Sequence, residues 1–313
     1  MQGRTFNGTA WAGRTHNPRA TGDLIADPVD ILEHFLRLQN WGYPQPSVKA
    51  GHAYDPGALI NTASTVQGFD YAGLSNIRAC RPGFQINSVS NSDINKIKQE
   101  LCQSFFMASY RNGAGLECVL PLDFNPYDGF PDGYGSPLEI TFADVYGEVG
   151  EIQEADPQYC WSQPQVNYAY DNGAGKYGKL LAILDVTASK FSAACVTGFE
   201  NLTDAENMWN LCRILYKRHG NLDVPTTAAR ERPYIKNYAD ALWYLSLHID
   251  WMLNRQRRIS VPCNYEKGRG IYPGMIVQLT LSQTGTVYCL VEKIKRDKNA
   301  DSTVFVLIII DSP

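Results

Sequence analysis

The stretch from Pro233 to Ile310 constrains the fold of this chain more than any other part of the sequence. Its apolar spacing predicts a long amphipathic helix over Pro233–Asn254. One face of this helix is formed by Ile235, Tyr238, Ala239, Leu242, Leu245 and Ile249. Alternating residues then predict four strands, over Arg258–Cys263, Met275–Leu281, Thr286–Ile294 and Ser302–Ile310. No motif for chemistry lies here, so the stretch predicts a structural module that ends in an antiparallel β-barrel-like unit over about residues 258–313.

Two helices are predicted in the first part of the chain. Asp27 is a candidate N-cap, and Pro28 suits the first helical position because its missing N–H costs nothing there. The apolar face of this helix is Val29, Leu32, Phe35 and Leu36. A second helix is predicted over Ser92–Tyr110, ended by Asn112-Gly113 and followed by a strand over Leu116–Leu122. This order predicts a compact α/β module over residues 27–125.

The loop Asp123–Ser136 is dense in Asp, Gly, Pro and Tyr and is the predicted domain boundary. Beyond it, strands are predicted over Leu138–Asp144, Gln165–Tyr170, Leu180–Thr187 and Ser192–Thr197. A capping box, Thr203-Asp-Ala-Glu206, begins a further helix that ends at Gly220. The predicted fold class is therefore α+β and multidomain, with β-barrel or β-sandwich-like modules. Its parts are an extended arm over residues 1–26, the α/β insertion unit over 27–125 and a β-rich module over 126–313.

Composition narrows the possible partners. Of the 313 residues, 44% are hydrophobic and 19% charged, which is enough for a sizeable core. The net charge of -4 argues against specific nucleic-acid binding, which relies on a basic face.

The 8 cysteines are scattered without a CxxC pair, so we expect reduced and mostly buried thiols. The longest apolar run, Val304–Ile310, is too short to cross a bilayer, and we expect no membrane anchor.

Two glycine- or aspartate-rich segments resemble ligand loops. Gly173–Lys179 has the spacing of a phosphate-binding loop, but Leu180 follows where Ser or Thr must hold magnesium. A turn between two strands is the better interpretation.

The loop from Asp123 to Asp132 is similar to a calcium loop, but its register is off by one and Tyr134 stands where such a loop needs Glu. Asx turns are preferred here, and calcium binding at this loop stays open.

The sequence predicts no catalytic, cofactor-binding or metal-binding residue. Two carboxylate pairs, Asp30 with Glu33 and Glu148 with Glu151, have the residue types of a glycosidase. Such pairs occur by chance in a chain with 32 Asp and Glu residues. Cys195 and Cys212 are possible nucleophiles, but nothing marks a partner base. A carbohydrate-binding module, with several of the 6 Trp in one groove, is a further alternative.

An ordered series of short motifs resembles the phage tail hub and tail-tip attachment proteins, a baseplate-hub-like family. The early motifs are the helix Asp27-Pro-Val-Asp-Ile-Leu-Glu-His-Phe-Leu36, the helix and strand over Ser92–Leu122, and the strand Leu138–Asp144. The late motifs are Ala241–Leu245, the basic exit Arg255–Arg258, Ile259–Val261, the turn and strand Tyr272–Leu279, and the strands Val287–Ile294 and Thr303–Ile310. Met275 departs from the pattern because Asp usually follows Pro-Gly. The barrel expected before the first helix is also not found in the sequence.

This resemblance implies a non-enzymatic component of the virion tail tip, made in the host bacterial cytoplasm, without a cofactor. It implies a homotrimer around an axial channel, with a distal tail ring protein, a tail fibre or spike protein and the tape-measure protein as partners. The segments Asp123–Ser136 and Tyr43–Ser90 are candidate interfaces. The edge of Ser302–Ile310 is expected to pair across the ring. The alternatives are a tail-associated cell-wall hydrolase and another virion structural protein, such as a baseplate wedge or neck protein.

Overall fold

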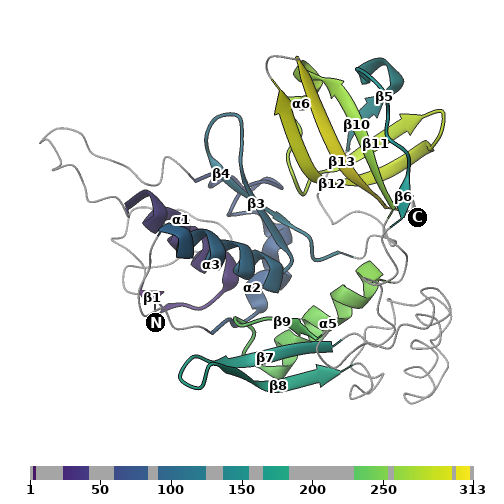
Figure 1. Ribbon diagram of the computed structural model, residues 1–313. Coiled ribbons are helices and arrows are strands. Elements are labelled where there is room, and N and C mark those ends of the chain that lie inside the picture. Colours follow the sequence, from purple (N-terminus) through teal and green to yellow (C-terminus); the bar gives the residue numbers. More distant parts are fainter. Residues whose placement is uncertain are drawn as a thin grey trace, which may run out of the picture. The chain divides into compact units, whose positions relative to one another are not determined.

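Figure 1 shows the computed structural model of the chain, a mixed α+β fold with several sheets, as predicted. The structure describes residues 3–4, 24–41, 60–83, 91–124, 137–154, 165–182, 229–252, 257–297 and 301–310. The chain divides into two compact units. Unit 1 comprises Met1–Asp123, Ala169–Lys176 and Arg232–Asp240, and unit 2 comprises Phe124–Tyr168, Tyr177–Glu231 and Ala241–Pro313.

Unit 1 is built on the predicted first helix, α1 (Pro28–Trp41). The backbone N–H of Asp30 donates to Asp27 Oδ1 at 2.9 Å, which confirms Asp27 as the N-cap. Three of the four predicted apolar residues, Val29, Leu32 and Leu36, are at most 1% exposed. Two short helices, η2 (Ala72–Leu74) and α2 (Ser75–Ala79), and the strand pair β1 (Gly3–Arg4) and β2 (Leu24–Ile25) complete this part of the unit.

The predicted second helix is correct at its start and wrong at its end. Helix α3 (Asn91–Ser104) stops six residues before Tyr110, and strand β3 (Met107–Arg111) takes over. Phe106 makes the change of direction with a φ of 46°, a left-handed conformation that no helix continues. Strand β3 pairs antiparallel with β4 (Glu117–Pro121), the predicted strand. Pairing with β4 in a hairpin satisfies the backbone hydrogen-bonding groups of β3. This pairing outweighs the helical spacing of the apolar residues in the sequence.

Residue Asn112, expected to end a helix, lies instead in the turn of this hairpin. Its Oδ1 accepts hydrogen bonds from the backbone N–H groups of Ala114 and Leu116, both at 3.0 Å. Asx side chains stabilise turns in this way. Behind β4, Ile60 forms a parallel bridge with Glu117, so the buried strand β4 is contacted on both of its edges.

The four predicted C-terminal strands are all present and form one sheet in unit 2. They are β10 (Arg257–Asn264), β11 (Ile276–Leu281), β12 (Gly285–Asp297) and β13 (Ser302–Ile310), with the short helix α6 (Tyr265–Gly268) after β10. Neighbouring strands of the four are antiparallel. The turn at Tyr272-Pro-Gly274 is also confirmed. Tyr272 O accepts the N–H of Met275 at 3.1 Å, and Gly274 has the φ of 85° that a type II turn requires.

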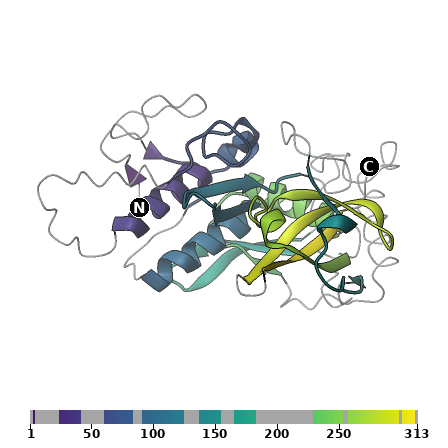
Figure 2. The same ribbon diagram turned by 90° about the horizontal axis from the view of Figure 1, so that it is seen from above.

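A segment from earlier in the chain closes this sheet. Residues 137–154, which we call the strap, contain β5 (Leu138–Thr141), η3 (Phe142–Asp144) and β6 (Gln153–Glu154). Strand β5 lies parallel to β11 at one edge of the sheet, and β6 lies antiparallel to β10 at the other. The sheet order is therefore β5-β11-β12-β13-β10-β6, with both end strands supplied by one segment. Figure 2 shows the yellow and green strands curving around a common interior, with the teal strap beside them.

The interior of this barrel is apolar. Its buried residues are Ile140, Ile259, Val261, Cys263, Ile271, Val277, Leu279, Leu281, Cys289, Val291, Phe305, Leu307 and Ile309. The sequence predicted a strand over the whole of Leu138–Asp144, but β5 ends at Thr141. The cause is a capping box, in which Thr141 and Asp144 bind each other's backbone N–H and turn the chain into η3.

The remaining described elements lie between these parts in the sequence. Strands β7 (Gln165–Asp171), β8 (Lys176–Ala182) and β9 (Arg230–Glu231) form a three-stranded sheet. The glycine-rich segment 172–175 joins β7 to β8, which confirms the turn predicted in place of a phosphate loop.

Helix α5 (Tyr238–Met252) starts five residues later than predicted, because Asn237 caps it by accepting the N–H of Asp240. Its buried face also differs from the prediction. Ala241, Tyr244 and Leu245 are buried, whereas Tyr238 and Ala239 are exposed.

Several predictions fall outside the described residues. They are the strand over 192–197, the capping-box helix over 203–220, most of the arm over 1–26, half of the candidate interface over 43–90 and most of the one over 123–136. The predicted domain boundaries at residues 26 and 125 stay a prediction. In the described part of the chain, no helix is long and apolar enough to cross a membrane.

Candidate functional site

The carboxylates named in the sequence lie in two different settings. Asp30 and Glu33 are both 0% exposed on α1. Glu148 and Glu151 are exposed on the strap. Each pair therefore has its own surroundings.

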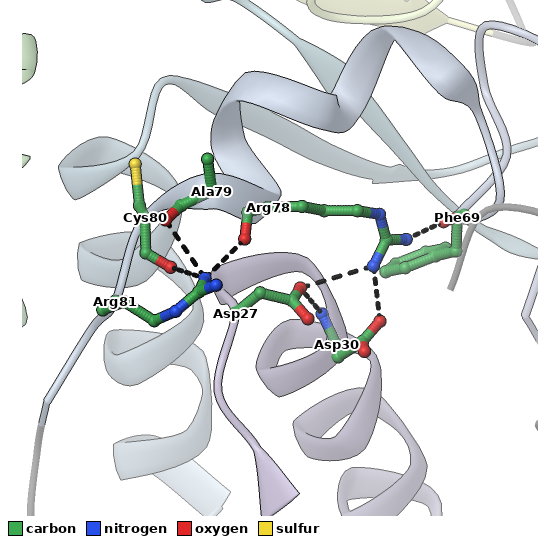
Figure 3. A network of polar contacts seen from close by, with 7 residues as sticks. All are labelled: Asp27, Asp30, Phe69, Arg78, Ala79, Cys80 and Arg81. Carbon is green, nitrogen blue, oxygen red and sulfur yellow. Dashed lines mark hydrogen bonds and ion pairs between the residues drawn. The ribbon is translucent and has the colours of Figure 1, made fainter. Parts of the chain in front are cut away.

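Arg78 occupies the space beside Asp30, as Figure 3 shows. Its Nη1 lies 2.6 Å from Asp30 Oδ1 and 3.3 Å from Asp27 Oδ1, and its Nη2 donates to the carbonyl of Phe69. The side chain of Arg78 is only 10% exposed and that of Asp27 only 4%. One guanidinium thus connects α2, the start of α1 and the chain before η2. This arrangement is a buried structural tie that holds three parts of unit 1 together.

Burial and, to a smaller extent, the neighbouring Asp30 carboxylate raise the pKa of Asp27 to about 6. Arg78 opposes both effects by favouring the ionised form. In a glycosidase two carboxylates face a sugar across an open site. Here Asp30 of the pair considered in the sequence faces a guanidinium in the interior, so its role in the described structure is structural.

A second tie joins α2 to the start of α5 in unit 1. Arg81 Nη1 donates to the carbonyls of Arg78, Ala79 and Cys80 at 2.8, 3.1 and 2.9 Å, which satisfies the free end of α2 (Figure 3). The backbone N–H of Arg81 donates to Asp240 Oδ2 at 2.8 Å.

Asp123 is an unusual carboxyl group in unit 1. Burial raises its pKa to about 7, and its Oδ2 is buried without a hydrogen-bond partner in the described structure. Burial, together with the charges of Asp240 and Asp123, raises the pKa of the Cys80 thiol to about 12. Such a thiol stays protonated at neutral pH and is a poor nucleophile.

The cysteines that the structure describes are consistent with reduced, buried thiols. They are free and buried, at positions 80, 102, 118, 263 and 289. The candidate nucleophiles Cys195 and Cys212 lie outside the described residues. Among the described side chains, no group of three or more His, Cys, Asp or Glu residues is arranged to hold a metal ion.

The strap is the part of the described surface with most apolar exposure. Six large apolar side chains are exposed among the described residues, and four lie on the strap. These four are Leu138 (45%), Phe142 (74%), Tyr146 (62%) and Ile152 (39%). Its other apolar residues, Ile140, Val145 and Val149, pack against the barrel core. The strap therefore has an inner side that closes the barrel and an outer side whose apolar groups face water.

The outer side of the strap is also acidic. Its exposed carboxylates are Glu139, Glu148, Glu151 and Glu154, and residues 137–154 contain no Lys or Arg. The remaining carboxylate, Asp144, is tied down by Lys267 Nζ at 3.1 Å. Burial alone would raise the pKa of Asp144, but hydrogen bonds from Thr141 and Lys267 lower it below its ordinary value. An apolar and acidic surface of this kind suits contact with another protein, because exposed apolar patches mark interaction sites.

The sequence did not single out the strap as a surface. Glu148 and Glu151 were considered only as a catalytic pair, and Phe142 only as part of a strand. The signal that was present is the alternation of aromatic and acidic residues without a basic one, from Phe142 through Tyr146 to Glu151. Its meaning depends on knowing that β5 and β6 lie at the two edges of one sheet.

Comparisons with solved structures find likenesses to phage tail proteins, of which two follow. The chain is similar to the tail protein from Neisseria meningitidis MC58, with a TM-score of 0.39 and 10% identity, over 92% of this chain and 69% of that chain. It is also similar to a chain of the phage P2 baseplate in its activated conformation with Ca, with a TM-score of 0.20 and 8% identity, over 75% of this chain and 57% of that chain. No protein-family model and no curated protein matches the sequence. Both structural overlaps are loose, with TM-scores below 0.5.

Proposed function

We propose that this chain is a non-enzymatic structural component of a phage or prophage tail tip, a baseplate-hub-like protein that forms a symmetric ring. The observation that carries the proposal is the strap. Four large apolar side chains stand exposed on 15 residues that close a barrel, from Leu138 to Ile152. Exposed apolar side chains on one short segment suit contact with a partner, which would cover them in an assembly.

The sequence supports the same function. The motifs that resemble the tail hub family fall on α1, on the α3–β4 region and on the strands of the barrel, in the family's order. In this proposal the copies form a homotrimer around an axial channel in the virion. A distal tail ring protein lies on one side of the ring, a tail fibre or spike protein on the other, and the tape-measure protein contacts the channel.

The proposal is tested by the mass of the full chain in solution. Light scattering at two protein concentrations and at low and high salt reports the number of copies directly. A stable trimer supports the hub. A stable dimer or hexamer assigns the chain to another class of virion assembly protein. A monomer under all conditions contradicts a ring formed by this chain alone, and a screen for lytic activity on cell walls then becomes the next experiment.

A further inference from the structure

We propose that the acidic strap of one copy binds a basic face on β12 and β13 of a second copy, so that the barrels associate head to tail. This inference rests on the proposed function, since it names the contact by which the ring would form.

The register fixes which side chains of the barrel point outward. Phe305, Leu307 and Ile309 of β13 lie in the core, so the alternate residues Val304 and Val306 face out. Both valines are half-buried. They form the apolar part of the outer surface on β13.

Two lysines of β12 lie beside these valines. Lys293 is the cross-strand partner of Val306, and Lys295 is the partner of Val304. Directly paired residues project from the same side of a sheet, so the lysines also face out. Both are exposed, and within the described residues neither has an ion-pair partner. We call Lys293, Lys295, Val304 and Val306 the basic face.

The later half of the strap, residues 146–154, lies on the other side of β13, beyond β10. The N–H of Gly150 donates to Ser260 O at 2.8 Å, and the N–H of Tyr146 donates to Pro262 O at 2.9 Å. Ser260 and Pro262 are in turn the β10 partners of Val306 and Val304. This half of the strap, which carries Glu148 and Glu151, is therefore three strand spacings from β12, about 14 Å along the sheet. The other half, β5, is two spacings from β12 through β11.

The strap and the basic face are different patches of one copy, carried by different strands of the sheet. A contact between them therefore joins different patches on the two copies, which is a heterologous contact, and such contacts form closed rings when the rotation per copy allows it. A strap against a strap would bring Glu148 and Glu151 against the same carboxylates, and two basic faces would oppose their lysines. Like charges in contact are unfavourable, so charge selects the head-to-tail arrangement.

The two surfaces also have matching apolar groups. Tyr146 and Ile152 on the strap are exposed beside its carboxylates. Val304 and Val306 are half-buried beside the lysines. Exposed ion pairs contribute little individually. In this contact the apolar groups supply the affinity, and the four charges determine which surfaces meet.

The test reverses the charges on each surface of the full chain. One variant carries Glu148→Lys and Glu151→Lys, a second carries Lys293→Glu and Lys295→Glu, and a third carries all four changes. Light scattering over a concentration series at about 50 mM salt, where surface charges are weakly screened, gives the dissociation concentration of each. We expect at least a tenfold rise for each single-surface variant. The third variant, whose charges are again opposite, should return to the wild-type value.

A matched control reverses two exposed lysines outside the barrel, Lys176→Glu and Lys179→Glu. It changes the net charge as the second variant does and should leave the mass unchanged. All substituted barrel residues are exposed, so thermal unfolding should report folded protein throughout.

The outcomes separate the inference from the function. If the wild-type chain is a trimer and neither pair of charge reversals changes the measured mass, the inference is overturned and the proposed hub function stands. The inference is also overturned if the variant with all four substitutions dissociates like the single-surface variants, because restored charge complementarity should restore binding. A wild-type chain that is monomeric at every concentration overturns both.

Discussion

At the scale of single residues, the most consequential side chain in unit 1 is Arg78. It holds two carboxylates that are almost completely buried, and Asp27 and Asp30 have no access to water to replace it. Removing one partner of such a group leaves uncompensated charge in the interior. The presence of Arg78 is therefore a condition for the start of α1 to pack where it does.

We predict that Arg78→Met lowers the free energy of unfolding of unit 1 by about 3 kcal/mol at neutral pH. The loss should be smaller at about pH 5, because Asp27, whose pKa is about 6, is then protonated and needs no counter-charge. Chemical denaturation at the two pH values measures both effects. Arg269→Met is the control, because Arg269 is 65% exposed and its pair with Glu266 should change stability by less than about 0.5 kcal/mol. Equal losses for the two variants would contradict the prediction.

At the scale of elements, the strap separates residues that hold the fold from residues that are available for contact. Ile140 is 0% exposed in the barrel core, and Phe142, two positions later, is 74% exposed. The capping box at Thr141 causes this change, because it ends β5 and turns the chain outward. Substitutions at the two positions should therefore have different consequences.

We predict that Ile140→Ala costs about 2–5 kcal/mol of barrel stability, the usual range for deleting a buried Ile side chain. Phe142→Ala should change stability by less than about 0.5 kcal/mol, since its ring faces water. Chemical denaturation of both variants, compared with the wild type, measures the difference. If Phe142→Ala were as destabilising as Ile140→Ala, the outward position of its ring would be wrong.

The packing of α6 on β13 gives a second element-scale prediction. A Cβ at Gly268 would lie 2.6 Å from Thr303 Cβ, and Thr303 is fully buried. Gly268→Ala should therefore cost about 1–3 kcal/mol through overpacking. Gly270, two residues later, has open space around it and provides the matched control. Gly270→Ala should be neutral or stabilising by up to about 1 kcal/mol, because it restricts the unfolded chain. Thermal unfolding of the two variants measures both effects, and a loss of stability in Gly270→Ala would contradict the prediction.

The elements that could be predicted from sequence are those whose pattern is local. Strand β13 matches its predicted range residue for residue, and Asp27 caps α1 as expected. The end of α3 could not be predicted, because the helical spacing of apolar residues continues to Phe105 and the pairing of β3 with β4 decides the outcome. The strap could not be placed either. Its path depends on register with β11 and β10, which come far later in the chain.

The candidate site was unpredictable for the same reason. Exposure of Phe142 and Tyr146 follows from which side of the strap faces the barrel, and that side is set by β10 and β11. The outward position of Lys293 depends on the irregularity in β12 between Val291 and Lys293, which changes the register against β13. Sequence spacing alone contains neither fact.

At the scale of the whole molecule, the two units should respond differently to pH. Asp123 in unit 1 has a pKa of about 7, against 3.8 for an ordinary aspartate. Between these pH values the folded unit keeps a proton that the unfolded chain releases, so stability is lost as pH rises from about 4 to 7. Asp27 acts in the same direction, with a pKa of about 6. In the barrel, the pKa of Asp144 is lowered, so its contribution is lost only at pH values below about 4.

We predict two calorimetric unfolding transitions, of which only the transition of unit 1 falls in temperature between about pH 4.5 and pH 7.5. Asp123→Asn should reduce that slope, because the uncharged amide has no proton to lose, and the barrel transition should not move. The effect of Asp123 amounts to at most about 4 kcal/mol. Two variants assign the transitions to the units. Arg78→Met should lower only the transition temperature of unit 1, and Ile140→Ala only that of the barrel. If both transitions shifted together with pH, or if Asp123→Asn left the slope unchanged, the buried carboxyl would not be the origin of the pH dependence.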